Sequence, residues 1–312
     1  MPFTIITGSF RVVGRSSAGN PTGFSPDGDS IHFAPDDLGL LDRLTVLNEP
    51  ADPTSVGSVQ LRMEGIDALE LHFQPQVRGA RNTHQPRPLA DDSRDALVEG
   101  LGLDPVSYRP PGLLRVKPPA VNDGARGWIL SRSLDVHGRP VAFLFTGSLP
   151  QGASDGGTIF LERPLLRRSA NYAQLAAGHA YPLFYDTLFV ALRASLAGAA
   201  RSAQQHGRGL IAADTTLTGV DASSVAVLAQ TGVVFPKLFR RLVEFYAEGN
   251  LGLAGFGAWL AAKHEQVLDL DTRNFTHFDD VVVVEGTKVR LTKPSARLVF
   301  ISDKGKLRPN QP

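Results

Sequence analysis

The sequence contains 312 residues, of which 42% are hydrophobic and 20% are charged, with a formal net charge of +1. These values are ordinary for a globular protein large enough to bury a core, and they exclude a disordered chain and a strongly basic coat for nucleic acid. Because cysteine is absent, disulfides, thiolate nucleophiles and cysteine-bound zinc or iron–sulfur centres are excluded as well.

Five segments of the chain have the pattern of β-strands. In each of them, apolar, β-branched and aromatic residues alternate or follow one another between Gly, Pro and Asp turns. The segments are 3–13, 28–35, 58–67, 126–135 and 139–147. Two Pro-, Gly- and Asp-rich stretches, 34–57 and 74–90, are predicted to be insertions in loops.

Helices are predicted between and after these strands. Residues 91–103 start with an acidic, serine-containing turn and place Leu97 and Leu101 at helical spacing, which predicts a short helix. Residues 165–206 predict two helices separated at Gly178–Pro182. Five strands, with one helix after the third and others after the fifth, are the element order of an OB-type barrel. We therefore predict an α+β fold, built on a five-stranded OB-type β-barrel with helical additions.

The sequence pattern changes after residue 213. Residues 235–249 and 256–270 have the periodicity of amphipathic helices, and residues 279–301 read as strands around a glycine turn. We predict one domain over residues 1–213 and a C-terminal α+β extension over residues 214–312.

Arg62, Asp67 and Glu70 are charged residues in or beside the third predicted strand, in "RMEGIDALE" (62–70). A charge on a core strand is costly to bury unless it is paired, hydrogen-bonded or bound to a metal ion. The clustering of Arg62, Asp67 and Glu70 therefore indicates either a partner or a chemical role for these side chains.

The segment "DGDS" (27–30) has two interpretations. The simpler one is an Asp-Gly turn between strands. The alternative is the motif of a GDS-type serine esterase, with Ser30 as the nucleophile. That alternative needs a catalytic Asp and His close together near the C-terminus, and His277 in "NFTHFDD" lacks the usual Asp three residues before it.

Four motifs follow one another along the chain: "DGDS", "RMEGIDALE", "DVHGR" and "NYAQLAAG". In their order they resemble the staphylococcal nuclease-like (thermonuclease) family, which carries Asp-Gly-Asp-Thr, Arg before Asp-Thr-Pro-Glu, Asp-x-Tyr-Gly-Arg and Asn-x-x-Leu-x-x-x-Gly. The Arg-to-Asp-to-Glu spacing and the Asp-to-Gly-Arg spacing match residue for residue. The resemblance covers about residues 3–213 and implies that they form the OB-fold catalytic domain, with residues 214–312 supplying no catalytic residue.

The resemblance also implies a role for each matched residue. Asp29 and Asp67 correspond to calcium ligands of the family, and such oxygen ligands would also suit Mg²⁺ or Mn²⁺. Glu70 corresponds to the general base. Arg62 and Arg139 correspond to the two arginines that hold the scissile phosphate, for which the planar guanidinium is better suited than lysine.

Candidate substrate-binding residues are less sharply indicated. His137 takes the place of a tyrosine that lines the nucleotide pocket in the family. Tyr181, Phe184 and Tyr185 lie where the family carries tyrosines that contact the nucleotide, and aromatic rings stack on bases without reading sequence. Core packing of the second helix is an equally good explanation for these three aromatic residues.

The resemblance implies a calcium-dependent nuclease that hydrolyses phosphodiester bonds of DNA, with RNA as a further substrate. Endonuclease action that leaves 3′-phosphate ends is the form expected. A non-catalytic OB-type module that binds nucleic acid or acts as a scaffold is the first alternative, and the serine esterase is the second. Residues 214–312 are expected to pack on the barrel, to form an oligomer or to bind a regulatory partner.

The expected location is the cytoplasm. The segment "MPFTIITGSFRVVGRSS" lacks the basic region, apolar run and small-residue cleavage site of a signal peptide. The longest apolar-leaning run, 223–235, is too short and too polar to span a bilayer. We therefore expect no membrane segment.

Overall fold

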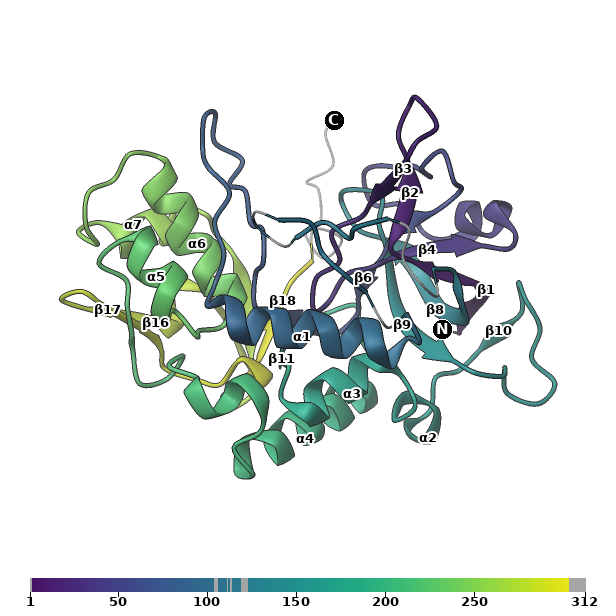
Figure 1. The fold of residues 1–312 in the computed structure, drawn as a ribbon. Coiled ribbons are helices and arrows are strands. Elements are labelled where there is room, and N and C mark those ends of the chain that lie inside the picture. Colours follow the sequence, from purple (N-terminus) through teal and green to yellow (C-terminus); the bar gives the residue numbers. More distant parts are fainter. Residues whose placement is uncertain (1, 104–105, 111, 113, 119–122, 303–312) are drawn as a thin grey trace, which may run out of the picture. The chain divides into compact units, whose positions relative to one another are not determined.

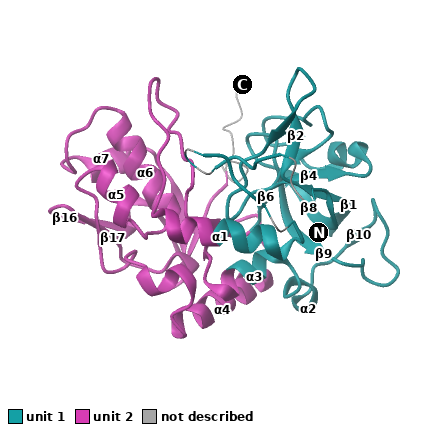
Figure 2. Cartoon of the chain, in the orientation of Figure 1, with its two compact units in different colours: residues 1–64, 93–174 teal, residues 65–92, 175–312 magenta. Residues whose placement is uncertain are grey.

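The computed structural model describes residues 2–103, 106–110, 112, 114–118 and 123–302. The fold is mixed α+β and contains a nearly closed, barrel-shaped sheet and several helices (Figure 1). The chain divides into two compact units (Figure 2): unit 1 comprises Met1–Glu64 and Ser93–Gln174, and unit 2 comprises Gly65–Asp92 and Leu175–Pro312. The predicted boundary between residues 213 and 214 lies inside unit 2. Within the described part of the chain, no helix combines the length and the apolar character needed to cross a membrane.

The main sheet of unit 1 has the strand order β5-β4-β1-β8-β9-β6, with β10 on a further part of β1. Its pairs are antiparallel except for β6 and β9, which are parallel. The first and last strands of this order, β5 and β6, are separated in the chain by Leu61 alone, and this connection nearly closes the sheet into a barrel. The strands are β1 (Phe3–Arg11), β4 (His32–Pro35), β5 (Val59–Gln60), β6 (Arg62–Met63), β8 (Ala125–Leu134), β9 (Pro140–Thr146) and β10 (Thr158–Ile159).

The barrel core is formed by large apolar side chains from these strands. Phe10, Phe33, Trp128 and Phe143 are fully buried, and the Trp128 ring stacks on Phe145 with 4.1 Å between ring centroids. Gly8 is required in β1, because a Cβ at this position would lie 2.2 Å from the carbonyl oxygen of Ala34 on β4. Buried and half-buried residues largely alternate along β1, as expected for a strand in a sheet.

The other elements of unit 1 lie between or after the barrel strands along the chain. The hairpin of β2 (Val13–Arg15) and β3 (Pro21–Gly23) follows β1. The predicted insertion at 34–57 contains a 3₁₀ helix, η1 (Leu38–Arg43), and α2 (Arg163–Leu166) lies in the C-terminal part of the unit. The chain passes between the units within α1 (Arg87–Gly100) and within α3 (Ala170–Ala177).

The described residues of unit 2 form helices and three small sheets. Its two-stranded sheet pairs β7 (Ile66–Ala68) with β11 (Ala180–Pro182). A four-stranded sheet has the order β12 (Phe184–Tyr185), β18 (Leu298–Phe300), β14 (Gln266–Asp269) and β15 (Asn274–His277), and a three-stranded sheet has the order β13 (Val220–Asp221), β17 (Lys288–Leu291) and β16 (Val282–Glu285). The helices are α4 (Val190–Gln205), α5 (Val225–Thr231), α6 (Pro236–Ala247) and α7 (Phe256–Ala261), with 3₁₀ turns η2 (Gly209–Ala213), η3 (Asp279–Val281) and η4 (Ser295–Arg297).

The helix α6 follows directly from its sequence. Pro236 stands in the first turn, where its missing N–H costs no helical hydrogen bond. Leu238, Phe239 and Leu242 recur at helical spacing and are fully buried. Arg240 and Arg241 are charged residues of the same helix. Their guanidinium groups form the ion pairs described below.

Several predicted elements differ from the structure. The predicted strand 28–35 is a strand only over β4, and the first predicted helix of 165–206 is two helices, α2 and α3. The segment 58–67 is three short strands instead of one, and the turn between β6 and β7 contains Gly65 with φ of +80°. The predicted second helix starts only at Val190, because residues 180–185 pair as β11 and β12. The predicted helix 256–270 ends at Ala261, and β14 follows it.

Candidate functional site

Arg62 and Arg139 meet at one carboxylate on unit 1. Arg62 begins β6, which pairs in parallel with β9, and Arg139 is the residue before β9. The carboxylate is that of Asp135, directly after β8. Its Oδ2 accepts hydrogen bonds from Arg139 Nη2 at 2.7 Å and Nε at 2.8 Å, and Arg62 Nη1 lies 4.0 Å away. Each arginine side chain is 31% exposed, so both guanidinium groups are held in place and still reach solvent.

Asp135 is fixed by the turn "DVHGR". Its Oδ1 accepts the backbone N–H groups of His137 and Arg139, both at 3.0 Å. Gly138 in this turn has φ of +73°, and a Cβ there would lie 2.2 Å from the carbonyl oxygen of Pro50. Burial would raise the pKa of Asp135, but the charge and hydrogen bonds of Arg139, with the charge of Arg62, hold it below its ordinary value. The side chain of Asp135 is therefore a fixed anion between two cations.

Asp29 also belongs to unit 1, in the turn between Asp27 and Ser30. Its carbonyl oxygen accepts the N–H of Met63 at 3.0 Å, so its backbone lies beside β6, one residue from Arg62. Gly28 is held by the side chain of Gln174, whose Nε2 donates to the Gly28 carbonyl at 2.7 Å. Ser30, the candidate esterase nucleophile, is 7% exposed, and its Oγ accepts a hydrogen bond from Gln60 Nε2 at 3.4 Å.

The fourth motif, "NYAQLAAG", supports the same part of unit 1. Asn171 is fully buried. Its Oδ1 accepts the N–H of Leu144, and its Nδ2 donates to the carbonyl oxygens of Glu64 and Ala142, at distances of 2.9–3.0 Å. The amide thus joins the end of β6 to β9. Arg62 lies on β6, and Arg139 is the residue directly before β9.

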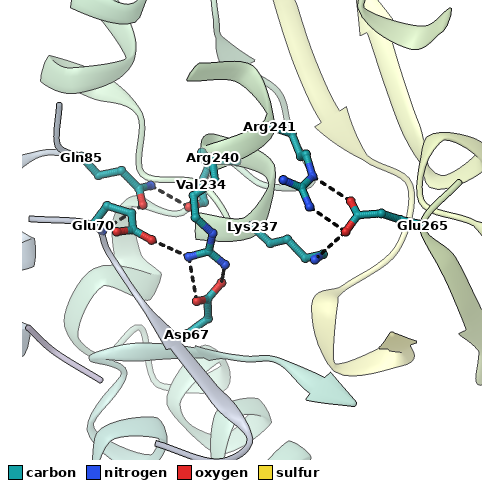
Figure 3. Close-up of polar contacts among 8 residues, drawn as sticks. All are labelled: Asp67, Glu70, Gln85, Val234, Lys237, Arg240, Arg241 and Glu265. Atoms are coloured by element: carbon teal, nitrogen blue, oxygen red, sulfur yellow. Dashed lines mark hydrogen bonds and ion pairs between the residues drawn. The ribbon is translucent and has the colours of Figure 1, made fainter. Parts of the chain in front are cut away.

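Asp67 and Glu70 lie in unit 2 and share the guanidinium group of Arg240 (Figure 3). Asp67 is the central residue of β7, and Arg240 is on α6. Arg240 binds Asp67 through two bonds, Nη1 to Oδ1 and Nη2 to Oδ2, each 3.0 Å, and its Nη1 also donates to Glu70 Oε1. The side chains are 4% (Asp67), 16% (Glu70) and 23% (Arg240) exposed. Burial would lower the pKa of Arg240, but the two carboxylates raise it well above its ordinary value.

Gln85 fixes Glu70 relative to the start of α6. Its Oε1 accepts the N–H of Glu70 at 3.2 Å, and its N–H donates to the Glu70 carbonyl at 2.8 Å. Its Nε2 donates to the carbonyl oxygens of Gly232 and Val234, both at 2.8 Å. Gln85 is fully buried, so the Glu70 segment and the residues that lead into α6 are tied together in unit 2.

A second ion cluster joins Lys237 and Arg241 of α6 to Glu265, the residue before β14 (Figure 3). Glu265 Oε1 is 2.8 Å from Lys237 Nζ and 2.7 Å from Arg241 Nη2, and Glu265 Oε2 accepts from Arg241 Nε at 2.8 Å. Lys237 is almost completely buried and also lies 4.5 Å from the ring centre of Phe300. Burial would raise the pKa of Glu265, but Arg241 and Lys237 lower it to about 2.

The candidate substrate-binding residues have different environments. His137 is exposed at the turn between β8 and β9 of unit 1. Tyr181 of unit 2 is 4% exposed, its ring packs edge-on against Phe235, and its hydroxyl donates to Asp214 Oδ1 at 2.8 Å. Tyr185 is half-buried and lies against Phe300, and Phe184 is fully buried. The rings of Tyr181 and Phe184 are therefore part of the core of unit 2.

Replacing Tyr181 with phenylalanine is expected to lower the free energy of unfolding by about 1–2 kcal/mol, because a buried hydrogen bond to a carboxylate is lost. Burial and the charge of Asp214 raise the pKa of Tyr181, so the hydroxyl is a donor throughout the physiological range. Urea denaturation measures the change. Tyr172→Phe, at a half-buried tyrosine of α3, is the matched control and is expected to change stability by less than about 0.5 kcal/mol. Equal effects of the two substitutions would contradict the importance of the Asp214 bond.

The carboxylates of Asp67 and Glu70 do not fit a calcium ion as unit 2 places them. Calcium is coordinated by about six to eight oxygen atoms. Both oxygens of Asp67 and one oxygen of Glu70 are already bound by Arg240. Among the residues that the structure describes, no group of three or more His, Asp or Glu side chains could hold a metal ion. The calcium assignment for Asp29 and Asp67 stays a prediction.

Asp135 and Arg240, the ion-pair partners of the candidate residues, were not themselves among the candidates from the sequence. Asp135 had a signal, because it begins "DVHGR" four residues before Arg139. Arg240 had none, since its partners Asp67 and Glu70 are 173 and 170 residues away and the sequence around it predicts only an amphipathic helix.

Models of known protein families do not match this sequence, and no curated protein is significantly similar to it. The resemblance to the staphylococcal nuclease-like family therefore rests on the four motifs and their spacing.

Proposed function

We propose that this protein is a nuclease of the staphylococcal type, which hydrolyses phosphodiester bonds of DNA and of RNA, as an endonuclease. The observation that carries the proposal is the convergence of Arg62 and Arg139 on Asp135. Two partly exposed guanidinium groups, oriented by one buried carboxylate, offer the charge-assisted, planar donors that bind phosphate oxygens well. Arg62 and Arg139 are 77 positions apart in the chain, and the family resemblance implies that both bind the scissile phosphate.

An OB-type barrel is part of the proposal. If β5 and β6 are counted as one strand, since Leu61 alone separates them, unit 1 has five principal strands. Numbered along the chain, they are ordered 3-2-1-4-5, and the parallel pair of the third and fifth strands joins the two ends. This order supports a five-stranded Greek-key OB barrel, a fold that commonly binds nucleic acids.

The proposed reaction adds water to the phosphorus atom and breaks its bond to the 5′ oxygen, leaving a 3′-phosphate and a 5′-hydroxyl. Arg62 and Arg139 hold the phosphate oxygens and stabilise the charge that grows on them in the transition state. Arg139 directs Nε and one Nη2 hydrogen to Asp135, and a guanidinium has five N–H donors, so donors remain for the phosphate. The resemblance assigns the proton of the attacking water to Glu70, and the departing 5′ oxygen takes up a proton from solvent water. No step is assigned to a metal ion.

A non-catalytic nucleic-acid-binding module is the second candidate function. The observation in its favour is that Asp67 and Glu70 both bind Arg240, so their burial is explained by an ion pair without any chemistry. This candidate predicts binding of nucleic acid through Arg62 and Arg139 without cleavage.

The deciding experiment is incubation of the purified protein with plasmid DNA and with labelled single-stranded DNA and RNA, in Ca²⁺, in Mg²⁺ and in EDTA. Cleavage with 3′-phosphate ends is the result expected from the nuclease. Binding in a mobility-shift assay without cleavage in any buffer would support the binding module and contradict the nuclease.

Arg139→Lys is expected to lower kcat for cleavage by roughly 10- to 10²-fold, because lysine keeps the charge but not the planar group that can bind Asp135 and phosphate together. Single-turnover and steady-state rates on the best substrate of the previous experiment measure the change. Arg126→Lys is the control, since Arg126 also pairs with an aspartate on unit 1, Asp36, but at an exposed position. An Arg139→Lys protein with the wild-type kcat would remove Arg139 from the proposed phosphate site.

A further inference from the structure

The cluster of Asp67, Glu70 and Arg240 has the arrangement of a cation site that is already filled. Arg240 presents two nitrogens to the two oxygens of Asp67, at 3.0 Å each, and its Nη1 also donates to Glu70 (Figure 3). The guanidinium therefore bridges the two carboxylates, as a divalent cation would. Such bidentate contacts are the strong form of the arginine–carboxylate pair.

The position of Arg240 is set by the rest of unit 2. On one side, Gln85 joins Glu70 to Gly232 and Val234, directly before α6. On the other side, the neighbouring Lys237 and Arg241 of α6 bind Glu265. These contacts fix the start of α6, and with it the backbone of Arg240, in unit 2.

Burial makes the pair difficult to replace. Asp67 is almost completely buried, and Glu70 and Arg240 are mostly buried. A cation that enters between the carboxylates has to lose its own water and leave the Arg240 guanidinium without its partners, and a buried charge without a partner is strongly unfavourable. A calcium ion that stays in solution keeps its water and leaves the ion pairs of Arg240 intact, so neither cost arises.

We propose that Arg240 is the resident cation of the Asp67–Glu70 pair, and that this pair binds no calcium ion while Arg240 is present. For catalysis, which rests on the function proposed above, the consequence is that Arg240 positions Glu70 and that cleavage proceeds without divalent cations. Arg240 is a positioning residue in this scheme, since it acts through Glu70.

Calorimetric titration of the full chain with CaCl₂ tests the proposal without an activity assay. Wild-type protein and Asp67→Asn are expected to give the same isotherm, because Asp67 is not a calcium ligand. Arg240→Met removes the cation and keeps a side chain of similar length, so it is expected to gain a calcium site with a Kd on the order of 10⁻³ M. The double variant Arg240→Met/Asp67→Asn is expected to lose that site. Arg240→Lys keeps the charge and is expected to bind calcium no better than wild type.

The comparison of wild type with Asp67→Asn decides the question even where Arg240→Met does not fold. Wild-type calcium binding that is absent in Asp67→Asn would overturn the proposal. If circular dichroism shows Asp67→Asn to be unfolded, Glu70→Gln takes its place in the same comparison. A folded Arg240→Met protein that gains no calcium site would also overturn it, since the two carboxylates would then have no capacity for a cation.

Cleavage in excess EDTA tests the catalytic consequence. Equal rates in EDTA and in Ca²⁺ are expected, and Arg240→Lys is expected to recover more of kcat than Arg240→Met. Cleavage that needs Ca²⁺, together with calcium binding that needs Asp67, would overturn the role of Arg240 and leave the nuclease assignment intact. Absence of cleavage in every buffer would contradict the nuclease, while the calorimetric comparison would still decide whether Arg240 is the cation of the pair.

Discussion

Glu70→Gln is expected to lower kcat for phosphodiester cleavage by ~10²–10⁴-fold, the usual effect of removing a general base. Glutamine keeps the shape of the side chain and an oxygen that can accept the hydrogen bond from Arg240. It cannot accept the proton of the attacking water. The affinity for nucleic acid is expected to stay within a few-fold of wild type, because phosphate binding is proposed for Arg62 and Arg139. Steady-state kinetics and a mobility-shift titration measure the two quantities.

Glu285→Gln is the matched control for this substitution. Glu285 is 62% exposed and pairs with Arg290 on the surface of unit 2, so the same chemical change is made away from Arg240. Wild-type kcat in Glu70→Gln would remove the general base from the scheme. If Glu70→Gln lowered the melting temperature as well as kcat, the loss of kcat would be explained by a structural role of Glu70 in unit 2.

Glu265→Gln is expected to lower the free energy of unfolding at pH 7 by about 3 kcal/mol. The pKa of Glu265 is lowered from 4.5 to about 2, and each unit of difference corresponds to ~1.4 kcal/mol. The substitution also leaves the buried ammonium of Lys237 without its carboxylate. Urea denaturation of both proteins, followed by circular dichroism from pH 7 to pH 2, measures the difference.

The sign of the pH dependence follows from the direction of the shift. A carboxyl group with a lowered pKa in the folded protein stabilises it above the unfolded-state pKa, and this contribution is lost as the pH falls toward the folded-state value. The difference between wild type and Glu265→Gln is therefore expected to be constant above about pH 5 and to shrink between about pH 4.5 and pH 2. A difference that stays the same over this range would contradict the ion pair. Glu285→Gln is expected to change stability by less than about 0.5 kcal/mol at every pH.

The sequence predicted the barrel strands best where burial follows a local pattern. The predicted segments 3–13, 126–135 and 139–147 correspond to β1, β8 and β9 within about two residues, because alternating or continuous apolar residues mark strands directly. The predicted strand 58–67 was wrong as a single element. Its residues contribute to two different sheets, and the Gly65 turn between them depends on pairing with β9 and β11.

The misses in unit 2 have a common physical reason. Residues 184–185 and 266–269 lie in segments that were predicted to be helical, and their pairing with distant strands decides otherwise. The partner of Asp67 and Glu70 was missed for the same reason, since the ion pair with Arg240 is a tertiary contact that no local pattern encodes. By contrast, the contact between Arg139 and Asp135 is local, because both residues and the glycine turn lie within five residues. The phosphate-binding role of Arg139 stays a prediction.

The interleaving of the two units along the chain also determines the order in which they can be completed during translation. All segments of unit 1 have been synthesised by residue 174, whereas unit 2 needs residues 65–92 from the first half of the chain and residues 175–302 from the second. Domains generally fold as units while the N-terminal part emerges first. The carboxylates of Asp67 and Glu70 therefore stay exposed to water until the α6 segment has left the ribosome. Only then can Arg240 form its ion pairs with them.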